Sequence, residues 1–119
     1  ICPEQHFEPA VKVLTRVISL PGVNKICIDL GHKAVAAEND ITKRIFFPDH
    51  PHLRPISQSE EHMVLETDEQ KSFTPGDLLI GIPYHICPTV ALHESLYEVQ
   101  NGNVVKEWNV MARKRKINI

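Results

Sequence analysis

The segment LLIGIPYHICPTV, residues 78–90, decides how the rest of the chain is interpreted. Its apolar beginning, residues 78–82, predicts a buried strand that contains Gly81. If the chain stays extended past this strand, the side chains of His85 and Cys87 point to the same side, because strand side chains alternate with a period of two. An imidazole and a thiolate on one face form half of a borderline-soft metal site, with positions left open for a substrate.

The spacing of these two residues is not specific by itself. An interior histidine beside a small buried cysteine explains most such patterns, and a closed structural zinc site would need four protein ligands. A second pair with the same spacing, His50 and His52, lies in a proline-rich loop expected over residues 49–55. Solvent-exposed histidines are the better interpretation there.

Three segments in this order resemble one enzyme family. They are DLGHKAV (residues 29–35), QSEEHMVL (residues 58–65) and GDLLIGIPYHICPTVALHESLYEV (residues 76–99). Together they resemble the C-terminal domain of the D-threonine aldolase and D-serine dehydratase family, which are pyridoxal-phosphate lyases related in fold to alanine racemase. Two positions depart from the family pattern. Tyr84 stands where Asn usually precedes the ligand His, and Met63 where Gly often follows the Glu-Glu-His.

The resemblance implies an N-terminal (α/β)8 barrel that binds pyridoxal phosphate through a Schiff-base lysine. That lysine would lie outside this chain, so residues 1–119 are expected to form one β-domain without a cofactor-binding residue, and Lys33 is not the Schiff-base lysine. The resemblance also implies that His85 and Cys87 hold a divalent metal at the β-hydroxyl of a D-amino-acid substrate. Thiolate and imidazole favour Zn²⁺ over Mn²⁺. The active site is expected between the two domains, near a homodimer interface.

The stretch Ser59-Glu60-Glu61-His62 places two carboxylates beside an imidazole just before an expected strand over residues 63–66. Strand alternation would put Glu60 and His62 on one face and Glu61 on the other. An ordinary charged turn is the alternative. The resemblance favours groups that face the site, either a carboxylate that orients a ligand imidazole or a group that transfers protons, with His62 as the catalytic candidate.

These features lead to the hypothesis of a metal-assisted, pyridoxal-phosphate-dependent lyase. It would cleave D-threonine to glycine and an aldehyde, or dehydrate D-serine, and this chain alone would be inactive. An amino-acid racemase of the same fold and a non-catalytic zinc-binding β-module are the alternatives. A small barrel that binds nucleic acid through the basic residues 113–116 is a further one, and it requires a basic face with exposed aromatic residues.

The patterning predicts a mainly β fold, a small antiparallel barrel or sandwich like the C-terminal domain of a fold-type III pyridoxal-phosphate enzyme. Asn101-Gly102 predicts a hairpin between strands over residues 96–100 and 104–110, with Trp108 packed under it. Gly31 is expected to adopt a backbone conformation that other residues resist. Further elements are strands over residues 10–20 and 25–29, a short helical turn within residues 34–39, and an irregular entry over residues 1–9.

Composition limits the remaining possibilities. The chain has 119 residues, enough for one small core, and its formal net charge of −2 gives no reason to expect nucleic acid or an anionic membrane as a partner. No apolar run is long enough to cross a bilayer. The three cysteines are far apart and make no disulfide framework, which fits a reducing cytoplasm. Because the chain starts at Ile1 and shows no signal-peptide pattern, we expect a piece of a longer polypeptide or a processed chain.

Overall fold

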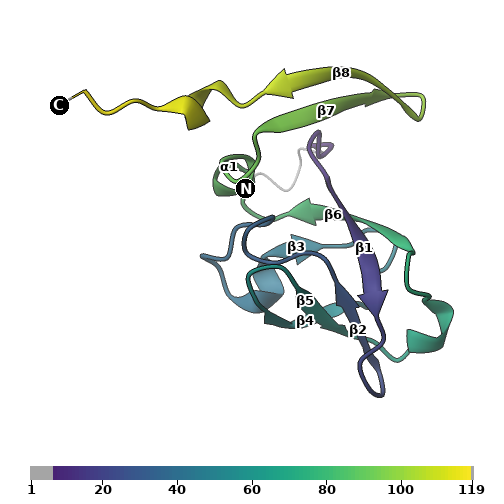
Figure 1. The fold of residues 1–119 in the computed structure, drawn as a ribbon. Helices are drawn as coiled ribbons and strands as arrows, with labels where there is room; N and C mark the ends of the chain where they lie inside the picture. The colour runs from purple at the N-terminus through teal and green to yellow at the C-terminus, as the bar shows by residue number, and fades with distance from the viewer. Residues whose placement is uncertain (1–6, 119) are drawn as a thin grey trace.

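The computed structural model describes residues 7–118, so most of the expected irregular entry, including Cys2 and His6, lies outside the described residues (Figure 1). Six strands form one antiparallel sheet in the order β3-β6-β1-β2-β5-β4, and the sheet curls into a half-barrel. The expected mainly β fold is therefore confirmed. The strands are β1 (Val13–Ser19), β2 (Lys25–Ile28), β3 (Ile45–Phe46), β4 (Arg54–Gln58), β5 (Met63–Glu66) and β6 (Leu78–Pro83).

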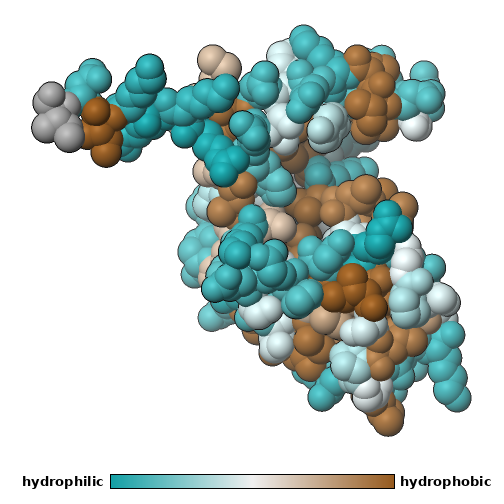
Figure 2. All heavy atoms as spheres, viewed as in Figure 1, coloured by the Kyte–Doolittle hydropathy of each residue, from teal (hydrophilic) through white to brown (hydrophobic). Residues whose placement is uncertain are grey.

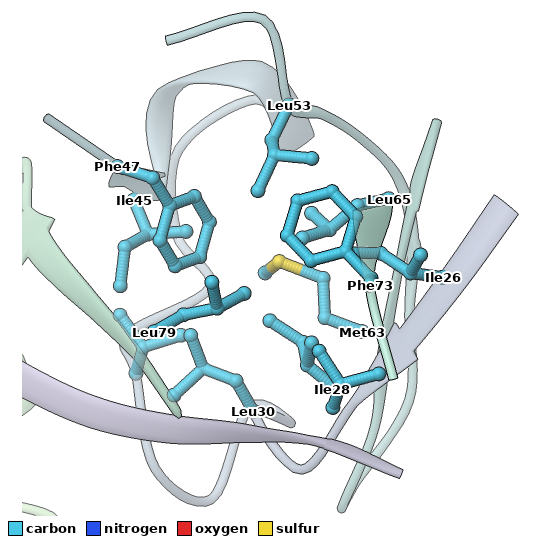
Figure 3. Close-up of a cluster of buried hydrophobic side chains, with 12 residues drawn as sticks. Ile26, Ile28, Leu30, Ile45, Phe47, Leu53, Met63, Leu65, Phe73 and Leu79 are labelled. Atoms are coloured by element: carbon cyan, nitrogen blue, oxygen red, sulfur yellow. The ribbon is translucent and has the colours of Figure 1, made fainter. Parts of the chain in front are cut away.

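Alternating side chains place a single hydrophobic core inside the curl of the sheet. In β1, Thr15 and Val17 point inward, while Leu14 and Arg16 between them are exposed. The inward residues of the other strands meet in one buried cluster (Figure 3). Its members are Val17, Ile26, Ile28, Leu30, Val35, Ile45, Phe47, Leu53, Met63, Leu65, Phe73 and Leu79.

Strand β4 is an element that the sequence pattern does not indicate. It begins at Arg54, inside the stretch expected to be a proline-rich loop, and Pro55 pairs with Leu65 of β5. Because β4 is at the edge of the sheet, the amide hydrogen that Pro55 lacks is not needed by a further strand. The neighbouring His52 is exposed, as expected, but His50 is half-buried with its ring centroid 5.2 Å from that of Phe73.

The predicted hairpin is present as β7 (Ser95–Gln100) and β8 (Asn103–Asn109). Asn101 and Gly102 have φ values of 51° and 77°, and two positive φ angles are what a two-residue type I′ turn requires. The hairpin forms a separate two-stranded sheet that stands beside the six-stranded one (Figure 1). The expected packing of Trp108 beneath the hairpin is wrong. Its side chain is 51% exposed, and its indole N–H donates to Glu98 at 3.0 Å.

Short helices complete the fold. The helix α1 (Ile86–Val90) follows β6, and three 3-10 helices are η1 (Ile41–Lys43), η2 (Gln70–Ser72) and η3 (Met111–Lys114). The helical turn expected within residues 34–39 lies earlier, since the amides of Ala34 and Val35 donate to the carbonyl of Gly31. Over residues 7–118, no helix combines the length and the apolar character needed to span a membrane.

Gly31 is required for a reason other than the one expected. Its φ is not positive, whereas those of Gly22, Gly76 and Gly102 are. Instead, a Cβ atom at Gly31 would overlap the backbone carbonyl of Glu60. The residues that follow Gly31 bond to the same segment, because the His32 amide donates to the Ser59 carbonyl at 2.9 Å. The absence of a side chain at Gly31 therefore lets two loops pack backbone to backbone.

Candidate metal centre

His85 and Cys87 lie where the strand β6 changes into the helix α1. His85 has an extended backbone, with φ −124° and ψ 100°, and immediately precedes α1, while Cys87 is the second residue of that helix. The expected extended course through Cys87 is therefore wrong, and strand alternation does not place the two side chains. Pro88 permits the helix because the first-turn amides of a helix have no intrahelical acceptor.

Both candidate ligands are accessible to solvent. The side chain of His85 is 51% exposed, and Cys87 is an exposed free cysteine. The alternative of an interior histidine beside a buried cysteine is thus wrong for this chain. Both residues start from the N-terminal end of α1, where an outside group can approach them.

A carboxylate from a distant segment contacts the candidate ligand imidazole. Glu38 Oε1 lies 2.5 Å from His85 Nδ1. The pKa of the Glu38 carboxyl is lowered, first by a hydrogen bond from its own backbone amide, then by the contact with His85 and the charge of Arg44, against an opposing effect of desolvation. The distance between Oε1 and Nδ1 is that of a hydrogen bond, and the tautomer of the ring decides which atom donates.

The helix α1 and the residues that follow it are tied to Ala34 and Ala36 by two further bonds. The buried hydroxyl of Thr89 donates to the His85 carbonyl at 2.9 Å and accepts the amide of Ala36 at 3.1 Å. The His93 ring donates from Nε2 to the Ala34 carbonyl at 2.8 Å. These bonds fix the start of α1, and with it the backbone of His85, against the segment that carries Glu38.

Replacing Thr89 with Val is expected to lower the free energy of unfolding by roughly 1–3 kcal/mol. The substitution keeps the shape of the side chain but leaves the buried Ala36 amide without its acceptor. Urea unfolding followed by circular dichroism measures the change. Thr89→Ser keeps the hydroxyl and is the matched control. Equal stability of the Val and Ser variants would contradict the role assigned to the hydroxyl.

The other sequence candidates lie in the turn before β5. His62 is exposed and closes the turn before β5, since the Ser59 amide donates to its carbonyl at 2.8 Å. Glu60 and Glu61 both contact Lys33 Nζ, at 3.0 and 2.6 Å, and together raise the pKa of Lys33 to about 12. The expected placement of the two carboxylates on opposite faces is wrong, because residues 59–61 form a turn and not a strand.

The described residues contain no larger cluster of candidate metal ligands. Within residues 7–118, no group of three or more His, Cys, Asp or Glu side chains is arranged to hold an ion. His62 is therefore not a third ligand beside His85 and Cys87. A solvent-accessible thiol and an accessible imidazole would suit a divalent metal of zinc type, with the other coordination positions open.

Sequence patterns gave no indication of Glu38. It is 47 positions from His85, and a lone glutamate in a segment of small and polar residues has no spacing that points to a ligand. Thr89 does lie within the quoted segment. A threonine hydroxyl that bonds the carbonyl four residues earlier is a familiar helical contact, which was the available signal for it.

The class of this domain follows from its similarity to known proteins. A family model described as "Putative serine dehydratase domain" matches residues 10–99, and the chain belongs to that family. It is 32% identical over 108 residues to D-threonine aldolase from Arthrobacter sp, an alignment that covers 90% of this chain and 28% of that enzyme. The chain thus spans less than a third of that relative's length.

Solved structures show the same relationship. The crystal structure of D-threonine aldolase from Filomicrobium marinum superimposes with a TM-score of 0.80 at 28% identity, covering 92% of this chain and 29% of that one. D-threo-3-hydroxyaspartate dehydratase from Delftia sp. HT23 shares the fold, with a TM-score of 0.65 at 20% identity, covering 82% of this chain and 31% of that one. The expected family is confirmed, and the chain matches the C-terminal β-domain of such enzymes.

Proposed function

We propose that this chain is the metal-binding β-domain of a pyridoxal-phosphate- and metal-dependent lyase that acts on D-β-hydroxy amino acids. The observation that carries the proposal is the accessible pair His85 and Cys87 at the start of α1, with the imidazole Nδ1 held by Glu38. A related case supports it. In D-threo-3-hydroxyaspartate dehydratase, a His and a Cys two positions apart were each replaced by Ala, and the structure of the Cys variant is described as the metal-free form.

The residues of this chain would bind and orient, while the bound groups supply the bond-breaking chemistry. His85 Nε2 and Cys87 Sγ would hold a divalent metal, Zn²⁺ or Mn²⁺, whose Lewis acidity would act on the substrate's β-hydroxyl. Pyridoxal phosphate, held by a barrel domain outside this chain, would supply the electron sink. With only two protein ligands, the coordination sphere keeps room for the substrate oxygen. His62, exposed before β5, is proposed as a proton-transfer group.

The barrel domain and a second subunit are the proposed partners. The outward face of β1 and β6 carries exposed apolar side chains, including Leu14, Leu78 and Ile80. Hydrophobic surface is visible below the hairpin on the side shown in Figure 2. Contiguous apolar surface of this kind marks contacts with other domains or chains. We propose that the barrel domain covers part of this surface in a homodimeric enzyme, located in the cytoplasm.

The alternatives differ in what the metal does. A zinc module without catalysis would need a closed set of ligands and would unfold on metal removal. A site with two protein ligands and open coordination positions favours a metal that takes part in a reaction. A racemase of the same fold would have no use for a metal at the β-hydroxyl.

Incubating the full-length protein with D-threonine and D-serine tests the proposal. We expect glycine and an aldehyde from D-threonine, or a keto acid and ammonia from D-serine. Chelation of the metal should stop either reaction, because the Lewis acid is removed. This chain should stay folded, and its thermal unfolding midpoint should change little, since the described core contains no metal ligand. Chromatographic product analysis and calorimetry are the measurements.

Formation of the L-amino acid without lyase products would replace the proposal with a racemase. Unfolding on chelation, without any turnover, would replace it with a structural zinc module. Undiminished turnover after complete metal removal would contradict the role of His85 and Cys87.

A further inference from the structure

We propose that Glu38 is a positioning residue that selects the Nδ1–H tautomer of His85, so that Nε2 presents its lone pair to the metal. This inference rests on the proposed metal site and adds a residue to it. Glu38 would not itself be a ligand, because its carboxylate contacts Nδ1 of the ring and no group of three or more His, Cys, Asp or Glu side chains among residues 7–118 is arranged to hold an ion.

The geometry of the contact supports the assignment of the tautomer. Glu38 Oε1 and His85 Nδ1 are 2.5 Å apart, and an ionised carboxylate has no hydrogen to donate. The proton in this contact therefore belongs to Nδ1, and a neutral imidazole then has its only lone pair on Nε2. A carboxylate behind a ligand histidine is the usual means of fixing ring orientation and raising ligand basicity.

A positive charge near Glu38 is fixed by hydrogen bonds to other segments. The side chain of Arg44, whose charge acts on Glu38, donates to the Asn39 carbonyl at 2.8 Å and to Gln58 Oε1 at 2.6 Å. Gln58 in turn donates to the carbonyl of Leu30, which precedes Gly31. The charge opposite Glu38 is thus fixed by bonds to the chain and to the edge strand β4.

The position of His85, the partner of Glu38 in this contact, is also fixed by hydrogen bonds. The Thr89 hydroxyl and the His93 ring bind α1 to Ala36 and Ala34, which lie two and four residues before Glu38. The backbone of His85 is held as well, because its carbonyl accepts a hydrogen bond from the Thr89 hydroxyl. Both partners of the contact therefore come from segments with defined positions, which a chance surface contact between two long side chains would not have.

The test is made on the 119-residue chain, with Co²⁺ as the probe. In the metal-free chain, ¹⁵N spectra of the histidine rings at a pH where His85 is neutral should show hydrogen on Nδ1 and none on Nε2. Glu38→Ala should lose this preference. A titration followed by the thiolate-to-cobalt absorption band should show an affinity about 10- to 100-fold weaker for Glu38→Ala than for the parent chain.

Asp40→Ala is the matched control, because it removes the same charge from the same exposed segment without a contact to His85. It should keep the tautomer and the affinity for Co²⁺. His85→Ala and Cys87→Ser identify the ring signals and the absorption band. Thermal unfolding of each variant shows that the fold is retained.

The outcomes separate this inference from the proposed function. Hydrogen on Nε2 in the parent chain, or equal affinity for Co²⁺ in the Glu38→Ala variant, overturns the role of Glu38 and leaves the metal site intact. A parent chain with the Nδ1–H tautomer but no thiolate band at any Co²⁺ concentration overturns the metal site, and the inference with it. An equal loss of Co²⁺ affinity in the Asp40→Ala variant would show that the effect comes from removing a negative charge anywhere in this segment. That result would also overturn the role of Glu38.

Discussion

Replacement of His85 by Ala in the full-length protein is expected to reduce turnover of D-β-hydroxy amino acids by about 10²–10⁴-fold. Loss of a Lewis acid removes several kcal/mol of transition-state stabilisation, and each 1.36 kcal/mol corresponds to a factor of ten in rate. The absorbance of bound pyridoxal phosphate should remain, because the cofactor lysine belongs to the proposed barrel domain. Steady-state kinetics together with an absorption spectrum of the purified variant provide both measurements.

His52→Ala is a suitable control for this experiment. His52 is also an exposed histidine, but its ring contacts Glu69 at 3.2 Å and lies in the loop before β4 instead of beside α1. It should leave turnover unchanged. Normal turnover in the His85 variant would remove the Lewis-acid role from this residue. Loss of the cofactor spectrum along with activity would point instead to a disrupted contact between the two domains.

Replacement of Gly31 by Ala is expected to lower the free energy of unfolding by roughly 3–5 kcal/mol, enough to unfold a marginal domain. The new Cβ would overlap the carbonyl of Glu60, and backbone atoms cannot move aside as the end of a flexible side chain can. The loops that contain Lys33 and Glu61 would have to separate, with loss of their ion pair. Urea unfolding gives the change in free energy.

Gly22→Ala serves as the comparison, because it tests backbone conformation without a steric clash. Gly22 has a φ of 79° and no atom within 4 Å of an added Cβ, so the expected cost is only about 1–2 kcal/mol. A similar cost at both positions would show that the packing of residues 31–33 against residues 59–61 can adjust, contrary to the structure.

The fold was largely predictable because its strands alternate and its turns have characteristic residues. Val17 and Ile26 belong to patterns with every second residue buried, and Asn101-Gly102 specifies the hairpin. The two-residue strand β3 and the edge strand β4 escaped prediction. The first is too short for a pattern to repeat, and Pro55 in the second is a residue that usually ends strands.

The site was predictable only in part. The family motif indicated His85 and Cys87. The extended backbone predicted through Cys87 was wrong, because a helix as short as α1 has no periodic pattern that could reveal it. Glu38 reaches His85 across 47 positions by a tertiary contact, which no local pattern encodes. The position of Trp108 depended on whether another element lay beneath the hairpin, and that too is decided by tertiary packing.

The bonds that secure α1 make the anchoring of this helix independent of the side chain at position 87. They come from the hydroxyl of Thr89 and the ring of His93, and the side chain of Cys87 takes no part in them. Residue 87 can therefore change its chemical character while the anchorage of the helix persists. A carboxylate in place of the thiolate would suit harder ions such as Mn²⁺ or Mg²⁺. A substitution at residue 87 would thus change the ion that the proposed site prefers, without changing the bonds that anchor α1.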